Sequence, residues 1–323
     1  MSKNSNKRSD PTSRTSRGRS NISNKRILVT GGAGFIGSNL VDELVKIGHK
    51  VIVIDNLSLG KREYVNSKAK FHELDIRDFK GIKPLFKGVD CVFHLAAQPR
   101  IQPSIVNPAE SFDNNVFGAF NVLLAAKENG VKKVVYSASS SAYGDQKELP
   151  LREDMTAHPK NPYALFKYMG EEMCGLFHSL YGLPVVCLRY FNVYGERQST
   201  EGAYATVIGI FLKQKKIGKP LTIVGNGKQM RDFTYVGDVA RANIAAMRSS
   251  KAVGHLINIG SGQNHSVNEV AEMIYEKHIF IPPRPGESMI TLADISKAKK
   301  LLGWEPRVSL EKWLGKQSLI SKP

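Results

Sequence analysis

This sequence predicts an α/β fold built on a doubly wound parallel sheet, followed by a smaller mixed α/β domain. The first observation is a short apolar run, Ile27-Leu28-Val29, that passes through four glycines into an apolar-periodic helical stretch at 38–47. The second is a repeated alternation of strand and helix up to residue 190, which is typical of a parallel sheet covered by helices. The third is a loosening of that alternation beyond Asn192, which indicates that a second domain begins there.

The elements of the first domain follow from short local patterns. Apolar runs bounded by charged residues or glycines predict buried strands, and apolar residues at helical spacing predict the helices between them. The predicted strands cover 27–29, 49–54, 70–73, 90–95, 133–137 and 184–189, and the predicted helices cover 38–47, 114–128 and 163–180.

Beyond Asn192, helices and short extended segments are expected without regular alternation. The predicted helices cover 202–213, 238–247, 267–277, 295–302 and 310–316, and the extended segments cover 221–224 and 256–259. The sequence therefore divides into a tail at 1–25, a dinucleotide-binding domain at 26–190 and a substrate-binding domain at 191–323. The part near 234–262 is expected to pack back on the first domain.

The composition is that of a globular protein with a basic N-terminal tail. Of 323 residues, 41% are hydrophobic and 23% are charged, and the net charge is +17. Residues 1–25 hold seven Lys or Arg against the single Asp10, so the tail supplies +6 and the rest of the charge is spread along the chain. Spread charge is typical of a solvated surface, so we expect no nucleic-acid partner. The tail is too poor in apolar residues to fold, and it lacks the amphipathic face of a transit peptide, so we expect it to be disordered.

Cysteine usage and hydropathy exclude several classes of protein. Cys91, Cys174 and Cys187 lie far apart, and no Cys/His cluster has the spacing of metal ligands. We therefore expect neither a disulfide framework nor a metal site, and a reducing compartment such as the cytoplasm. No apolar stretch reaches the ~20 residues that cross a membrane, so no membrane segment is expected.

The glycine-rich turn at 31–37 predicts a dinucleotide site. Glycines between a strand and a helix permit a tight turn and let the backbone approach a pyrophosphate, which the helix N-terminus attracts. An ordinary glycine-rich loop is the alternative, but Asp55 ends the next strand, eighteen residues after Gly37. An acid there can bind the adenosine ribose and repels a 2′-phosphate, so the pattern favours NAD over NADP.

Tyr163 and Lys167 form the candidate catalytic pair. They are four residues apart at the start of a predicted helix, so both side chains share one face. An ammonium beside a phenol lowers the pKa of the phenol, and a phenolate is a suitable base for an alcohol proton. The serine-rich segment 137–141 leaves the carboxyl end of a predicted strand, where open α/β sheets place ligands. These features together favour chemistry over a coincidental pair.

Several motifs in order resemble the extended short-chain dehydrogenase/reductase family, and within it the nucleotide-sugar 4-epimerases. The motifs are TGGAGFIG at 30–37, DN at 55–56, DI at 75–76, HLAAQ at 94–98, SASSSAYG at 137–144, YALFK at 163–167 and LRYFNVYG at 188–195. The resemblance runs from about Arg26 to Trp313, which is nearly the whole chain.

The resemblance implies a role for each matching residue. Tyr163 would be the base, Lys167 would bridge the nicotinamide ribose, and Ser139 would hydrogen-bond the reacting hydroxyl. The implied NAD-binding residues are Gly31, Gly34, Phe35, Ile36, Gly37, Asp55, Asn56, Asp75, Ile76, Leu95, Ala96, Ala97, Asn114, Tyr163, Lys167 and Tyr190. The implied residues for a UDP-sugar substrate are Ser139, Ser140, Tyr163, Asn192, Arg231, Arg284, Glu287 and Thr291.

Departures from the family pattern narrow the reaction. Relatives that eliminate water carry an Asp–Glu pair after the active-site Ser/Thr, and decarboxylating relatives carry a Glu at the second of these positions. Ser140 and Ser141 stand there in this chain, and a hydroxyl cannot replace a carboxylate in acid–base work. The resemblance therefore implies epimerisation, in which the C4 hydride passes to NAD and returns on the other face of the sugar.

The identity of the sugar is less constrained. Thr291 is smaller than the Tyr that restricts some relatives to glucose, and it leaves room for an N-acetyl group. The expected substrates are UDP-glucose and UDP-galactose, then UDP-N-acetylglucosamine and UDP-N-acetylgalactosamine. UDP-glucuronate 4-epimerisation is the alternative, together with a 4-keto-sugar reductase or dehydratase. A sensor that binds NAD without catalysis is disfavoured, because Ser139, Tyr163 and Lys167 are all present. Relatives often dimerise through a four-helix bundle, so the helices at 114–128 and 163–180 predict a homodimer.

Overall fold

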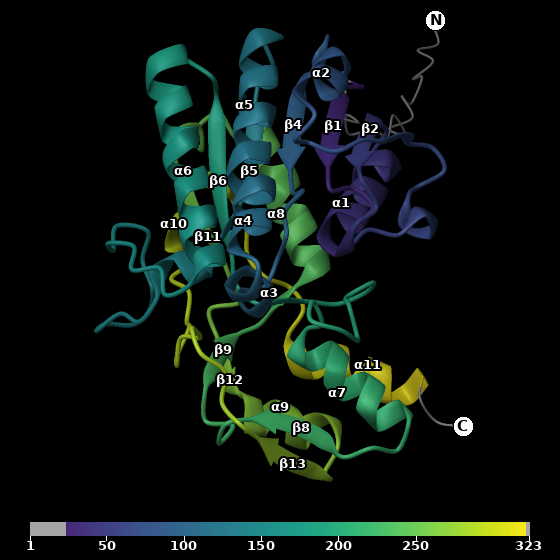
Figure 1. The fold of residues 1–323 in the computed structure, drawn as a ribbon, viewed down its shortest axis with the longest axis vertical. Helices are drawn as coiled ribbons and strands as arrows, with labels where there is room; N and C mark the ends of the chain where they lie inside the picture. The colour runs from purple at the N-terminus through teal and green to yellow at the C-terminus, as the bar shows by residue number, and fades with distance from the viewer. Residues whose placement is uncertain (1–23, 321–323) are drawn as a thin grey trace, which may run out of the picture.

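The computed structural model describes residues 24–320, and its central element is a seven-stranded parallel sheet (Figure 1). The order of the strands reverses between β1 (Arg26–Thr30) and β4 (Cys91–His94), and open α/β sheets bind ligands at such a switch point. The predicted doubly wound α/β fold is confirmed. The strand order is β11 (Leu256–Ile259), β6 (Val185–Tyr190), β5 (Val134–Ser139), β4 (Cys91–His94), β1 (Arg26–Thr30), β2 (Lys50–Asp55) and β3 (Lys70–Glu73).

Helices cover both faces of the sheet, as a parallel sheet requires. On one face, α1 (Phe35–Lys46) packs against α8 (Val236–Arg248), and their apolar side chains share a buried core with β1 and β6. On the other face, α5 (Gly118–Glu128) packs against α6 (Pro162–Tyr181) over a second core. A short helix, α10 (Ser296–Leu302), packs against β11 and α8.

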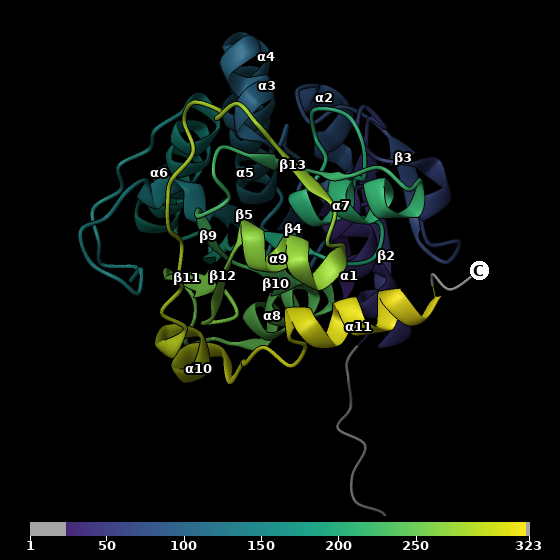
Figure 2. The same ribbon diagram turned by 90° about the horizontal axis from the view of Figure 1, so that it is seen from below.

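A second, smaller lobe lies beyond the carboxyl ends of the strands (Figure 1). Its helix α9 (Val267–Ile274) contacts both α7 (Val207–Lys216) and α11 (Leu310–Ile320), as Figure 2 shows from below. Phe211, Val270 and Trp313 belong to its separate apolar core. Its paired strands are β8 (Leu221–Val224) with β13 (His278–Ile281), β9 (Met230–Asp232) with β12 (Asn264–Ser266), and β7 (Val193–Tyr194) with β10 (Thr234–Tyr235).

Several predicted boundaries were wrong. The helix expected at 202–213 begins at Val207, because the Thr206 hydroxyl accepts the Gly209 N–H at 2.9 Å and caps it. The helix expected at 267–277 ends at Ile274, and the unpredicted strand β13 follows. Residues 101–117 hold unpredicted helical turns: α3 (Ile101–Val106), α4 (Pro108–Phe112) and a π-helical turn (Asp113–Phe117) that leads into α5. A further short helix, α2 (Phe79–Ile82), was also missed.

The remaining predictions concern the domain boundary, the N-terminal tail and membrane segments. Within 234–262, β11 is a strand of the large sheet and α8 packs against β5 and β6, while the domain boundary near residue 190 stays a prediction. The predicted tail lies almost entirely outside the described residues. Between residues 24 and 320, no helix combines the length and apolar character needed to span a bilayer.

Candidate active site

A cavity of about 750 Å³ opens at the carboxyl ends of the central strands and continues into the smaller lobe. It is lined by every residue that the sequence predicts for the cofactor, the substrate and the chemistry, with the single exception of Asp75. The fold therefore brings together, around one cavity, predicted residues whose positions run from 31 to 291.

The glycine turn is shaped so that only glycine fits. Gly31 has a φ of +72°, and a Cβ there would lie 2.6 Å from the Ala96 nitrogen. A Cβ at Gly37 would overlap the carbonyl oxygen of Gly31. Gly34 is the N-cap of α1, and no side chain caps that helix end. The free N–H groups of the first turn therefore face the cavity, where they can bind a pyrophosphate.

Asp55 ends β2 at the edge of the same cavity. Its carboxylate accepts the N–H groups of Ala33 at 3.0 Å and Leu57 at 2.9 Å, which ties it to the glycine turn. Burial raises the pKa of Asp55, and these two backbone donors oppose the rise. The carboxylate in this position suits the adenosine ribose of NAD, and the free helix end beside it suits the pyrophosphate.

Asp75 does not line the cavity. Its carboxylate accepts two hydrogen bonds from Arg77, at 2.7 and 3.0 Å, and one from Asn56 at 2.9 Å. The Arg77 guanidinium lowers the pKa of Asp75 to about 2. In this structure the carboxylate orients Asn56, which lines the cavity, and its expected contact with adenine stays a prediction.

Tyr163 enters the cavity from the first turn of α6. Asn161 caps this helix by accepting the Ala164 N–H at 2.8 Å, and Pro162 occupies the first helical position. The Tyr163 N–H donates to the Ser104 hydroxyl at 3.0 Å, which fixes the start of the helix. Burial raises the pKa of Tyr163, while the Ser139 hydroxyl and Arg100 lower it. Arg100 is the cation that lowers the pKa of Tyr163 here, and the effect expected of Lys167 on Tyr163 stays a prediction.

Lys167 is buried one turn further along α6. Its ammonium donates to the carbonyl of Ser137 at 2.8 Å, at the end of β5. Burial lowers the pKa of Lys167 to about 8, and the carboxylate of Glu171 opposes this. Glu171 is held by a buried pair of hydrogen bonds from Arg189, at 2.6 and 2.9 Å.

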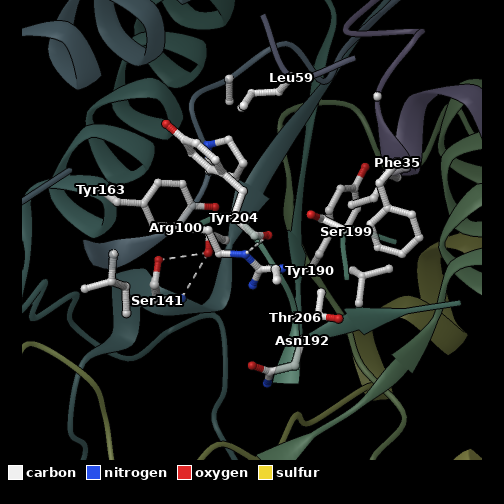
Figure 3. Close-up of a pocket in the computed structure, with 18 of the residues that line it drawn as sticks. Phe35, Leu59, Arg100, Ser141, Tyr163, Tyr190, Asn192, Ser199, Tyr204 and Thr206 are labelled. Carbon is white, nitrogen blue, oxygen red and sulfur yellow. Dashed lines mark hydrogen bonds between the residues drawn. The ribbon is translucent and has the colours of Figure 1, made fainter. Parts of the chain in front are cut away.

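The serine segment after β5 lies beside Tyr163. The hydroxyls of Ser139 and Ser141 are 2.8 Å apart, and Figure 3 shows Ser141 on the same side of the cavity as Tyr163. Ser140 also lines the cavity. No carboxylate stands in this segment, so it offers hydrogen bonds but no acid–base pair.

The predicted substrate residues line the part of the cavity nearer the small lobe. The Asn192 amide donates to the carbonyl of Asp232 at 2.9 Å and to the Thr291 hydroxyl at 3.2 Å. Arg231 donates to Glu287 at 3.3 Å, and burial lowers its pKa. Arg284 is exposed at the rim. Guanidinium groups in these positions suit a diphosphate, which they bind with parallel N–H donors.

Among the cavity residues that were missed from the sequence, Arg100 and Tyr204 contact each other. Arg100 follows the carboxyl end of β4, and its Nε donates to the carbonyl of Tyr204 at 3.1 Å. The Tyr204 hydroxyl accepts from Gln98 at 3.2 Å. Arg100 could have been suspected, since it comes six residues after a strand that ends at the ligand edge of the sheet. Nothing local marks Tyr204, which belongs to an irregular loop of the small lobe.

Comparisons with known proteins agree with this geometry. A Methanocaldococcus jannaschii protein with a provisional UDP-glucose 4-epimerase assignment is 43% identical over 296 residues, covering 88% of this chain and 94% of the relative. A UDP-glucuronate 4-epimerase from Thermodesulfobacterium geofontis is 38% identical over 312 residues, covering 89% and 93%. The crystal structure of the Thermotoga maritima UDP-glucose 4-epimerase with UDP-glucose matches with a TM-score of 0.87 and 39% identity, covering 91% of this chain and 99% of that one.

The family model for NAD-dependent epimerases and dehydratases matches residues 27–260, from the first strand through β11. This span contains the glycine turn, Ser139, Tyr163 and Lys167. The chain belongs to the NAD-dependent epimerase/dehydratase family.

Proposed function

We propose that this protein is a nucleotide-sugar 4-epimerase that uses tightly held NAD. The observation that carries the proposal is one continuous cavity that contains a dinucleotide turn, a Tyr163–Ser139 pair and two arginines suited to a diphosphate. Ser140 and Ser141 stand where elimination or decarboxylation needs carboxylates, which leaves epimerisation as the reaction these residues support best.

The chain's own residues hold and move the proton of the sugar. Ser139 hydrogen-bonds the 4-hydroxyl, and the Tyr163 phenolate accepts its proton. When bound, NAD+ supplies a reversible hydride acceptor for C4. Lys167 would support the nicotinamide ribose, and Arg231 and Arg284 would hold the diphosphate while the sugar ring turns over. Tyr163 then returns the proton, and the configuration at C4 is inverted.

UDP-glucose and UDP-galactose are the first proposed substrates, because one of the matching solved structures is a UDP-glucose 4-epimerase with UDP-glucose. The Thr291 hydroxyl accepts a hydrogen bond from Asn192, and Thr291 is a small side chain. Room therefore remains for an N-acetyl group, so interconversion of UDP-N-acetylglucosamine and UDP-N-acetylgalactosamine is a second proposed activity. UDP-glucuronate is the second candidate, and the half-buried cation Arg100, which lines the cavity, is the observation that favours it.

The test is to incubate the purified protein with UDP-galactose, UDP-N-acetylgalactosamine and UDP-glucuronate separately, without added NAD. We expect proton NMR to show inversion at C4 for at least one of them. If none inverts even after NAD is added, the proposal is wrong and a reductase becomes the better hypothesis.

We also propose that the protein is a homodimer that pairs α5 and α6 of two copies. These two helices pack together on one face of the sheet and expose large apolar side chains. The side chains are Phe120, Leu165, Leu176, Leu180 and Tyr181, and Phe117 of the turn before α5 is exposed as well.

A further inference from the structure

Glu171 and Arg189 form a buried ion pair between α6 and β6, which lie side by side in Figure 1. The Arg189 guanidinium donates to the two carboxylate oxygens of Glu171 at 2.6 and 2.9 Å, and the two side chains are 3% and 5% exposed. Burying two charges costs free energy that their attraction often fails to return, so stability alone does not account for such a pair. The neighbouring residues point to a second role.

Glu171 stands one helical turn from Lys167 on the buried face of α6. Side chains four residues apart on a helix are neighbours, with about 5–6 Å between their Cβ atoms. The Lys167 ammonium donates to the Ser137 carbonyl and lies 5.3 Å from the centre of the Tyr136 ring, and both of these groups are neutral. Burial lowers the pKa of Lys167 to about 8, and Glu171 is the strongest influence that raises it. The charge of Lys167 therefore depends on Glu171.

Arg189 holds Glu171 in place. Its guanidinium also lies 4.3 Å from the centre of the Tyr143 ring, at the end of the serine-rich segment. Burial raises the pKa of Glu171, and the two bonds from Arg189 oppose the rise, so the carboxylate is favoured as an anion. Among residues 24–320, no carboxylate lies within 4.0 Å of the Lys167 ammonium. Glu171 therefore acts on Lys167 through its charge and leaves N–H donors of the ammonium available to the cavity that Lys167 lines.

Glu171 is the buried carboxylate among the titratable groups around Lys167. His94 of β4 stays neutral, because burial lowers its pKa to about 3. The other titratable neighbours are the phenols of Tyr136, Tyr143, Tyr163 and Tyr168, the thiols of Cys174 and Cys187, the cation Arg100 beside Tyr163, and the exposed Glu172. On the helical turns packed against α6, the charged side chains of Glu110, Asp113, Lys127 and Glu128 are exposed as well. The nicotinamide end of NAD+ carries positive charge, so the cofactor does not replace Glu171.

We propose, on the basis of the 4-epimerase function above, that Glu171 is a positioning residue that keeps Lys167 protonated for the reaction at Tyr163, and that Arg189 fixes Glu171 for this purpose. An ammonium near a phenol favours the phenolate, so a neutral Lys167 would leave Tyr163 a poorer base. Glu171 thus extends the pH range over which the enzyme turns over.

The variant Glu171→Gln removes the negative charge and keeps the size of the side chain. The pKa of Lys167 should then fall by about one unit or more. With a UDP-sugar that the wild-type protein inverts, kcat should stay within about twofold of wild type at pH 6 and drop to about one fifth at pH 8, while KM hardly changes. Glu171→Asp keeps the charge, so its pH profile should stay close to that of the wild-type protein.

Two further variants separate this role from a structural one. Glu171→Gln leaves Arg189 buried without a partner and could fail to fold, so Glu171→Gln/Arg189→Met removes both charges together. The double variant should show the same displaced pH profile. Glu172→Gln is the matched control, because it removes the adjacent, exposed carboxylate of the same helix. It should leave the pH profile unchanged. Thermal melting is measured for every variant.

A direct titration of Lys167 does not depend on activity. NMR of the cofactor-free protein, labelled with 13C at the lysine Cε atoms, follows each ammonium, and Lys167→Met identifies the signal of Lys167. The pKa should be lower by about one unit in Glu171→Gln and in the double variant, and unchanged in Glu172→Gln.

An unchanged pKa of Lys167, together with a loss of thermal stability only, would overturn the inference and make Glu171–Arg189 a structural pair. A lowered pKa with an unmoved activity profile would overturn it too, because the reaction would not need the charge of Lys167. If the wild-type protein inverts no UDP-sugar, the proposed function fails separately. The titration then still decides whether Glu171 keeps the proton on Lys167.

Discussion

At the scale of single residues, Tyr163 is the group whose removal should affect turnover most. The variant Tyr163→Phe deletes the hydroxyl that transfers the proton and keeps the ring. We expect kcat to fall by about 10³-fold, within the range for loss of a general acid–base group. NAD content should stay at the wild-type level, as measured by release of the cofactor from denatured protein. A variant that turns over normally would contradict the assignment of Tyr163 as the base.

Lys167 gives a pH-dependent prediction for stability. Burial lowers its pKa to about 8, below the ordinary value, so folding a protonated Lys167 costs free energy. Between pH 8 and the ordinary lysine pKa, the unfolded chain holds a proton that the folded chain has released, so this cost disappears as the pH rises. The cost is fully present below about pH 8 and amounts to about 3 kcal/mol.

Urea unfolding of the cofactor-free protein at pH 7, 8.5 and 10 measures this effect. The wild-type protein should gain stability with rising pH relative to Lys167→Met, whose side chain cannot titrate. Parallel stability curves for the two proteins would show that Lys167 has an ordinary pKa in the fold.

At the scale of elements, the turn from β1 into α1 has no room for a side chain at Gly37. In the variant Gly37→Ala, the added Cβ would meet the Gly31 carbonyl, so the turn must shift. We expect a loss of about 2 kcal/mol or more in stability, together with weaker NAD retention. Gly175→Ala is the matched control, because Gly175 is exposed on α6 and no atom lies within 4 Å of a Cβ there. It should gain about 0.5–1 kcal/mol from higher helix propensity.

The elements that were predictable are those with local signals. Apolar runs marked the seven strands of the sheet, and the glycines marked the turn into α1. The helical turns at 101–117 were missed because Pro103 and Pro108 read as breaks in a helix. In the structure each stands near a helix start, where a missing N–H costs little.

The candidate site was predictable where a motif sits at a strand end. Tyr163, Lys167 and Ser139 all follow or face β5, and the fold brings them to one cavity. Arg100 and Tyr204 were not predictable in the same way. Their contact joins the loop after β4 to a loop more than a hundred residues later, and this pairing depends on the tertiary fold.

At the scale of the whole molecule, the exposed apolar face of α5 and α6 predicts a dimer. Leu176 and Leu180 are 53% and 64% exposed, which is unusual for side chains that stay in water. Replacing both with lysine would place charges in the proposed interface, and we expect the dimer to dissociate into folded monomers. Sedimentation equilibrium distinguishes the two states. A wild-type protein that sediments only as a monomer would contradict the dimer.

The central claim is that the two lobes enclose a sugar that is oxidised and reduced at C4 without net redox change. The most direct measurement is proton NMR of the reaction in D2O, starting from UDP-galactose or UDP-glucuronate and the protein as purified. We expect inversion at C4 with the original protium retained there, because the hydride leaves and returns without meeting solvent. Inversion with deuterium at C4 would contradict this mechanism, as would accumulation of reduced cofactor in proportion to the product.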